Sequence, residues 1–113
     1  MKLPNAECAS VTRTKVQSYL LNPDHPVGGS KAAFFLPFGY TPGKWRDLAE
    51  QLLAIARSGS VAETGETVFG TRYVIDAELI APDGTRLNVR TAWFIDDGKE
   101  QPRFITAHPL PKS

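Results

Sequence analysis

The chain has 113 residues and a formal net charge of +1, and 42% of its residues are hydrophobic, which suits one folded globular domain and excludes a disordered chain. Its single cysteine, Cys8, excludes an intramolecular disulfide and a zinc site built from cysteines. The sequence contains no signal-peptide pattern and no apolar run of the roughly 20 residues that cross a bilayer, so we expect a cytoplasmic protein without membrane contact.

Residues 11–22 predict a first, short helix. Thr12 and Thr14 are possible N-caps, and three hydrophobic side chains follow at helical spacing: Val16, Tyr19 and Leu20. Pro23 ends the pattern because proline cannot continue a helix.

A loop and a second helix are expected next. Residues 23–29 are dense in proline and glycine, which favour turns, and Ser30 is the expected N-cap of a helix over residues 31–35. Pro37 and Gly39 should end this helix.

The third helix has the clearest pattern in the chain. Thr41 and Pro42 are a cap residue followed by proline at the first helical position. One apolar stripe then runs to Arg57, with Gly59 as the expected end residue, through Trp45, Leu48, Leu52 and Ile55. We expect Trp45 to pack in the core, because aromatic side chains dominate core burial.

After Gly59 the hydrophobic period changes to two, which predicts strands over residues 61–67, 71–80, 86–95 and 103–108. One side of the middle strands is apolar, with Tyr73, Ile75, Ala77, Leu79, Leu87, Val89, Thr91 and Trp93. We therefore predict an α+β fold in a single domain over residues 1–113. Two to three N-terminal helices in residues 1–59 should pack on a four-stranded antiparallel meander in residues 60–113.

Common cofactor motifs are absent from the sequence. It has no phosphate-binding glycine loop, dinucleotide fingerprint, paired-histidine metal helix or nucleophile elbow. We therefore expect neither a cofactor nor a metal ion.

The loop before the second helix holds the most informative residues. His25 is constrained by neighbouring prolines and glycines near a helix N-terminus that favours anions, and Lys31 adds positive charge there. This pattern predicts a phosphate cradle with an ionisable group. The alternative is a turn in which His25 only hydrogen-bonds the backbone.

A second polar group lies on the predicted strands and comprises Arg72, Arg90, Arg103, Thr106 and His108. Alternation places Thr106 and His108 on one side of the last strand and Arg103 on the other. These residues are either a site on the mixed face of the sheet or an ordinary solvated strand surface.

Histidine, lysine, arginine and threonine without metal ligands suit the cleavage of RNA through its own 2′-hydroxyl. One group accepts the 2′-OH proton, another protonates the leaving 5′ oxygen, and fixed cations stabilise charge on the phosphorane oxygens. Histidine suits the proton steps because its ordinary pKa of about 6.5 leaves both forms available near neutrality.

Several segments carry a resemblance to a known family: residues 3–7 (LPNAE), 20–28 (LLNPDHPVG), 89–93 (VRTAW) and 102–107 (PRFITA). The chain resembles a bacterial family of unknown function, found as small stand-alone proteins and as the last domain of large secreted polymorphic toxins. By analogy, that setting implies a ribonuclease of the barnase–EndoU–colicin–RelE (BECR) fold, directed at tRNA and neutralised by an immunity protein or antitoxin. In place of the family's tyrosine after Thr-Ala, this chain has His108.

Our leading hypothesis from the sequence is a metal-independent, tRNA-directed ribonuclease that is the toxin of a toxin–antitoxin or toxin–immunity pair. Its catalytic residues would be His25 for proton transfer, Lys31 and Arg90 for phosphate binding, and Thr106 for substrate orientation; Thr91, Arg72 and His108 would contact substrate. The alternative is a non-catalytic module that binds a partner protein, as the immunity or adaptor half of such a pair. A third interpretation treats all these residues as solvent-exposed side chains without a function.

Overall fold

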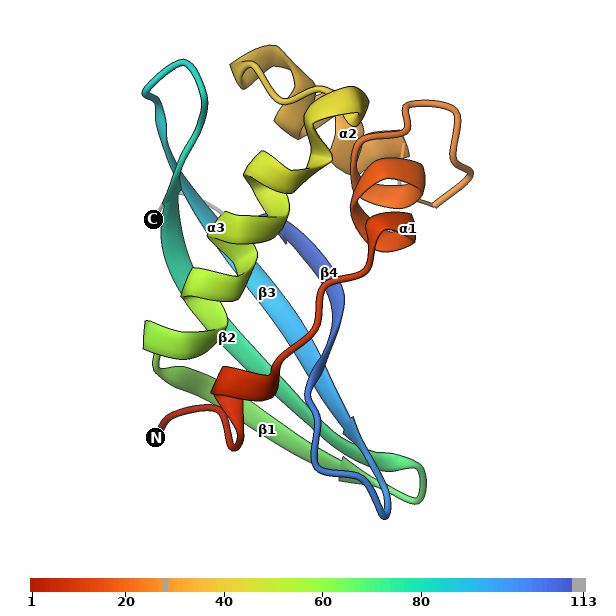
Figure 1. Cartoon of the computed structure of the whole chain (residues 1–113), viewed down its shortest axis with the longest axis vertical. Coiled ribbons are helices and arrows are strands. Elements are labelled where there is room, and N and C mark those ends of the chain that lie inside the picture. The colour runs from red at the N-terminus through yellow and green to blue at the C-terminus, as the bar shows by residue number, and fades with distance from the viewer. Residues whose placement is uncertain (28, 111–113) are drawn as a thin grey trace.

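The computed structural model describes residues 1–27 and 29–110 and confirms the α+β class. Helices come first and cover one face of a four-stranded antiparallel sheet (Figure 1). The strands pair in chain order and run β1 Val61–Thr67, β2 Gly70–Ile80, β3 Arg86–Asp96 and β4 Arg103–Pro109. The predicted meander is therefore confirmed, with every strand boundary within one residue of the expectation.

The first predicted helix consists of two consecutive pieces, α1 Arg13–Lys15 and η2 Val16–Leu20, the second with wider π-helical turns. Thr12 is its N-cap, and the Thr12 Oγ1 atom accepts a hydrogen bond from the Lys15 amide at 3.3 Å. A further short turn, η1 Ala6–Cys8, precedes it.

The second helix, α2 Gly29–Phe35, begins earlier than predicted, so the assignment of Ser30 as its N-cap is wrong. The Gly29 amide donates to the carbonyl of His25 at 2.9 Å, which starts helical hydrogen bonding inside the loop and places Ser30 within the helix. The chain continues through η3 Leu36–Phe38 and ends at Gly39, whose φ of 102° is left-handed.

The long helix α3 Trp45–Ser58 follows the turn η4 Pro42–Lys44 and packs on β2. Thr41 caps the turn, because its Oγ1 atom accepts from the Lys44 amide at 3.3 Å. The apolar stripe of α3 is buried as predicted, through Leu48, Ala49, Leu52, Ile55 and Ala56. Trp45 is half-buried against the core, and the Arg46 guanidinium lies 4.8 Å from the centroid of its ring.

The end of α3 requires glycine at position 59 for a steric reason rather than a conformational one. Its φ is −75°, which any residue adopts, but a Cβ atom there would lie 2.5 Å from Ile75 Cγ2 and 2.7 Å from the Ile55 carbonyl oxygen. Gly59→Ala is therefore expected to lower the free energy of unfolding by about 1–3 kcal/mol, measured by urea titration. Gly65→Ala on β1 is the matched control, because nothing lies within 4 Å of the added methyl group, and its effect should stay within about 0.5 kcal/mol. Equal effects of the two substitutions would contradict the steric explanation.

The core fills the space between the helices and the inner face of the sheet. Its largest fully buried side chains include Leu20, Phe35, Leu48, Leu52, Ile75, Leu79, Val89 and Trp93. Among the described residues, no helix is long and apolar enough to cross a membrane.

A β-bulge in β4 changes which residues share the outer face of the sheet. Thr106 and Phe104 pair with consecutive residues of β3, so Ile105 is an extra residue between them. Because this extra residue shifts the alternation by one, Arg103 lies on the same face as Thr106 and His108. The expectation that Arg103 points to the opposite side is therefore wrong.

Candidate functional site

Tyr19 on η2 joins three of the catalytic residues selected from the sequence. Its hydroxyl oxygen lies 3.1 Å from Thr106 Oγ1 on β4, and its ring meets the His25 imidazole edge-on with the centroids 5.1 Å apart. Lys31 Nζ on α2 lies 5.6 Å from the centroid of the same ring. We call the resulting group the Tyr19 cluster; its members are Lys15, Tyr19, His25, Lys31 and Thr106.

Lys15 and Tyr19 were not selected as site residues from the sequence. Lys15 Nζ lies 5.0 Å from the centroid of the Tyr19 ring, so two ammonium groups flank one aromatic side chain. The spacing of four residues between Lys15 and Tyr19 places both on one face of a helix, and this signal was present in the sequence. Two ammonium groups beside two hydroxyls are a combination of groups that suits an anion.

His25 is half-buried and is oriented by its own loop. Its Nδ1 atom accepts a hydrogen bond from the Val27 amide at 3.0 Å, which is the backbone contact expected if the loop is a simple turn. The contact with the Tyr19 ring is present as well. Because an accepting Nδ1 carries no proton, the neutral ring has its proton on Nε2. The Val27 contact and the edge-on Tyr19 ring therefore fix the orientation of the imidazole.

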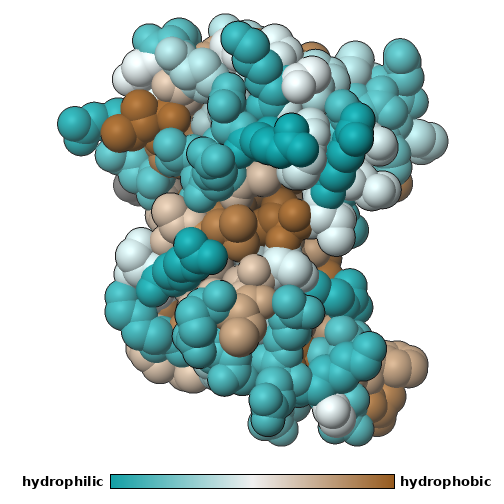
Figure 2. Space-filling view, viewed as in Figure 1, coloured by the Kyte–Doolittle hydropathy of each residue, from teal (hydrophilic) through white to brown (hydrophobic). Residues whose placement is uncertain are grey.

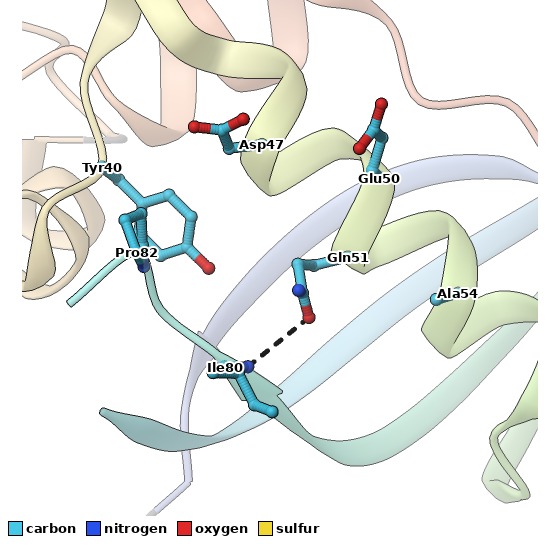
Figure 3. A pocket seen from close by; sticks show the side chains of 7 residues that line it. All are labelled: Tyr40, Asp47, Glu50, Gln51, Ala54, Ile80 and Pro82. Atoms are coloured by element: carbon cyan, nitrogen blue, oxygen red, sulfur yellow. Dashed lines mark hydrogen bonds between the residues drawn. The ribbon is translucent and has the colours of Figure 1, made fainter. Parts of the chain in front are cut away.

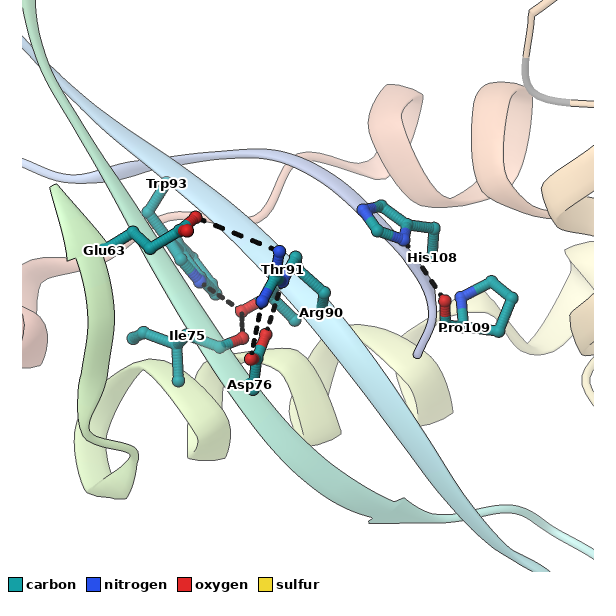
Figure 4. Close-up of polar contacts among 8 residues, drawn as sticks. All are labelled: Glu63, Ile75, Asp76, Arg90, Thr91, Trp93, His108 and Pro109. Carbon is teal, nitrogen blue, oxygen red and sulfur yellow. Dashed lines mark hydrogen bonds and ion pairs between the residues drawn. The ribbon is translucent and has the colours of Figure 1, made fainter. Parts of the chain in front are cut away.

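Arg90 on β3 is held by carboxylates on β2 and β1 (Figure 4). Its Nε and Nη2 atoms donate to the two carboxylate oxygens of Asp76 at 2.7 and 2.9 Å. Its Nη1 atom lies 3.9 Å from Glu63 Oε2 on β1. The guanidinium charge is thus compensated within the protein, and a substrate phosphate would compete with Asp76 for it.

The strand register relates Arg90 to the Tyr19 cluster. Arg90 pairs with His108, which is two residues from Thr106 along β4, and residues two apart on a strand project from the same face. Thr106 of the cluster and His108 therefore share the outer face of the sheet. Arg90 on β3 lies beside His108 on β4 on that same face.

The Asp76–Arg90 pair makes stability depend on pH. The hydrogen bond from Arg90, then the charges of Arg90 and His108, hold the pKa of Asp76 below its ordinary value of 3.8. A carboxylate whose pKa is lower in the folded state stabilises the protein above the unfolded pKa and loses this contribution as pH falls through the folded pKa. Asp76→Asn should therefore lower the free energy of unfolding at neutral pH and reduce its fall below about pH 4, measured by urea titration at both pH values. Parallel pH dependence in both proteins would contradict this assignment.

Thr91 is fully buried beneath the helices. Its Oγ1 atom donates to the Ile75 carbonyl at 2.9 Å and accepts from Trp93 Nε1 at 2.9 Å (Figure 4). These contacts make Thr91 a core residue that orients the Trp93 indole, and its buried hydroxyl does not face a substrate.

The remaining selected residues lie on or beside the outer face. Arg72 is exposed and pairs with Phe94 of β3, farther along the sheet than Arg90. His108 is half-buried, with Nδ1 3.3 Å from the Pro109 carbonyl oxygen (Figure 4). Arg103 forms a bidentate pair with Asp96 at 2.8 and 3.2 Å. Within the described ranges, no group of three or more His, Cys, Asp or Glu side chains is arranged to hold a metal ion.

The fold and this surface define a small α+β domain with a cationic, hydroxyl-containing cluster where its first helices meet the last strand of a meander sheet. The chain belongs to the family described as "Domain of unknown function (DUF6883)", whose model matches residues 2–111. No curated protein sequence matches the chain. It is similar in structure to a chain of a solved contact-dependent growth inhibition toxin–immunity protein complex from Klebsiella pneumoniae 342. The TM-score is 0.71 at 17% identity, over 88% of this chain and 98% of that chain, which shows a shared fold.

Proposed function

We propose that the protein is a metal-independent ribonuclease that cleaves tRNA in the cytoplasm as the toxic half of a toxin–immunity pair. The observation that carries the proposal is the Tyr19 cluster, which holds two ammonium groups, an imidazole and two hydroxyls together. The fold shared with a chain of a toxin–immunity protein complex supports the toxin–immunity part. The expected partners are a tRNA substrate and a cognate immunity protein.

In the proposed reaction, the RNA 2′-oxygen attacks the adjacent phosphorus and the 5′-oxygen leaves, which yields a 2′,3′-cyclic phosphate and a 5′-hydroxyl. Lys15 and Lys31 bind the phosphate and stabilise the charge that grows on the phosphorane oxygens. The His25 imidazole lies edge-on to the Tyr19 ring and holds that side chain in position beside the bound phosphate.

Proton transfer to the leaving group is assigned to the Tyr19 hydroxyl. The Tyr19 hydroxyl protonates the leaving 5′ oxygen, and the two lysines beside its ring stabilise the phenolate that forms. Thr106 orients the Tyr19 hydroxyl through their contact of 3.1 Å. The 2′-OH proton passes to solvent, and the Tyr19 phenolate then regains a proton from solvent. Arg72 and His108 extend the surface along the RNA backbone, and a phosphate that reached Arg90 would compete there with Asp76.

The test is incubation of the purified, folded protein with total tRNA, with and without EDTA, followed by analysis of the RNA ends. We expect cleavage that EDTA does not change and fragments that carry 5′-hydroxyl ends. Intact tRNA after incubation with folded protein free of inhibitor would refute the proposal.

The alternative, a non-catalytic module that grips a partner protein, is favoured by the exposed β1–β2 hairpin. Residues 62–67 of β1 are exposed at a sheet edge, and the turn beyond them exposes Val68 at 85% and Phe69 at 76%. Figure 2 shows hydrophobic surface at this end of the molecule, lower right. Exposed strand edges and apolar tips are common docking features. Induced expression in bacteria separates the two functions, because a toxin arrests growth and an immunity-type protein does not.

A further inference from the structure

A pocket of about 340 Å³ lies between α3 and the end of β2, and the residues that line it include no member of the Tyr19 cluster (Figure 3). Two carboxylates of α3, Asp47 and Glu50, line it together with Gln51. The β2 side contributes Ile80 and, just after the strand, Pro82. The volume is at the lower end of the range for small-ligand sites, which is roughly 300–1,000 Å³.

The Tyr40 hydroxyl is the unusual feature of this pocket. Tyr40 is only 2% exposed, and its hydroxyl oxygen has no hydrogen-bond partner among the described residues. Figure 3 shows the hydroxyl pointing into the space between α3 and the end of β2. Burial, then the charges of Asp47 and Asp83, raise the pKa of Tyr40 to about 12, so the hydroxyl keeps its proton at neutral pH. A buried hydroxyl of this kind is a hydrogen-bonding group whose capacity the protein's own described residues leave unused.

The negative charge of the pocket favours a cationic ligand. Asp47 and Glu50 line the pocket with no lysine or arginine among the lining residues, and Asp83 adds a third carboxylate near Tyr40. Asp83 is ionised at neutral pH, because hydrogen bonds from Thr85 lower its pKa. Three carboxylates around a pocket with an apolar wall create a negative potential.

The polar and apolar walls of the pocket indicate which kind of cationic group fits it. A planar guanidinium presents five N–H donors and can bond to more than one acceptor at once, whereas an ammonium is a point charge. Ile80 and Pro82 offer an apolar surface for the alkyl stem behind such a head group. Gln51 is held in place, because its Oε1 atom accepts from the Ile80 amide at 3.4 Å.

We infer that this pocket binds a guanidinium group on an alkyl stem, the chemistry of an arginine side chain, through Tyr40, Asp47 and Glu50. The site is separate from the proposed ribonuclease centre and does not depend on that activity.

The test is a titration of the full chain with Nα-acetyl-arginine amide, followed by NMR of the Ile80 amide and the Gln51 side-chain amide. Saturable shifts are expected, with at least tenfold weaker binding of the uncharged citrulline analogue. Equal binding of the two compounds would overturn the inference. Agmatine and a glycine-flanked arginine peptide separate the two sources of the group: tighter binding of agmatine supports a small-molecule ligand, and tighter binding of the peptide supports a protein side chain. Binding of neither would overturn the inference.

Two variants link binding to the pocket residues. Tyr40→Phe should weaken binding about tenfold, and its thermal midpoint should equal or exceed that of the wild type, because removing an unpartnered buried hydroxyl costs no internal hydrogen bond. Glu50→Gln should also weaken binding, whereas the matched change Glu66→Gln on β1 should leave it unchanged. Wild-type affinity in Tyr40→Phe, or a lowered midpoint, would contradict the assignment.

Discussion

Tyr19→Phe is expected to lower the rate of tRNA cleavage by roughly 10²–10⁴-fold, the usual loss when a proton-transfer group is removed. The substitution keeps the aromatic ring that packs against His25 and the two lysines and removes only the hydroxyl bonded to Thr106. Loss of one partly buried hydrogen bond should cost only about 0.5–1.5 kcal/mol of stability. The measurement is single-turnover cleavage of tRNA alongside urea unfolding of the same preparation.

The matched control for this substitution is Tyr73→Phe. Tyr73 lies half-buried on the inner face of β2 beside the core, so its hydroxyl is not part of the proposed site. We expect wild-type cleavage by this variant. If Tyr19→Phe cleaves tRNA at the wild-type rate, the Tyr19 cluster is not the catalytic centre, even where the protein itself proves to be a ribonuclease.

The fold was predictable because its signals are local. Thr12 and Thr41 cap the turns that the sequence indicated, and a period of two located all four strands. The wrong predictions concern features that tertiary contacts determine. Ser30 lies within α2, and the Gly29 amide donates a hydrogen bond to the His25 carbonyl at the start of that helix. The side of the sheet on which Arg103 lies depends on a bulge at Ile105, which no residue pattern predicts.

The candidate site was predictable only in part, because its centre forms between distant segments. His25, Lys31 and Thr106 were selected by residue type and loop composition, but the ring that joins them belongs to Tyr19, which the helical pattern assigned to an apolar stripe. Polar tips of amphipathic side chains are not visible in such a pattern.

The partner of Arg90 could have been found from the sequence. Once the turn between β2 and β3 is placed, an antiparallel register sets Asp76 opposite Arg90, and oppositely charged residues across two strands attract each other. The same register would have indicated that the charge of Arg90 is compensated before any substrate arrives.

Thr91→Val is expected to lower the free energy of unfolding by about 2–4 kcal/mol, although the two side chains have nearly the same shape. The hydroxyl of Thr91 donates to the Ile75 carbonyl and accepts from the Trp93 indole, and both contacts are buried. The valine leaves the Nε1–H group of Trp93 without its acceptor inside the core, at a cost of about 1–3 kcal/mol beyond the loss of the second hydrogen bond. Urea unfolding measures the effect, and Thr64→Val on the exposed part of β1 is the matched control, with a change within about 0.5 kcal/mol. If the two valine variants are equally stable, the Thr91 hydroxyl does not hold Trp93 in place.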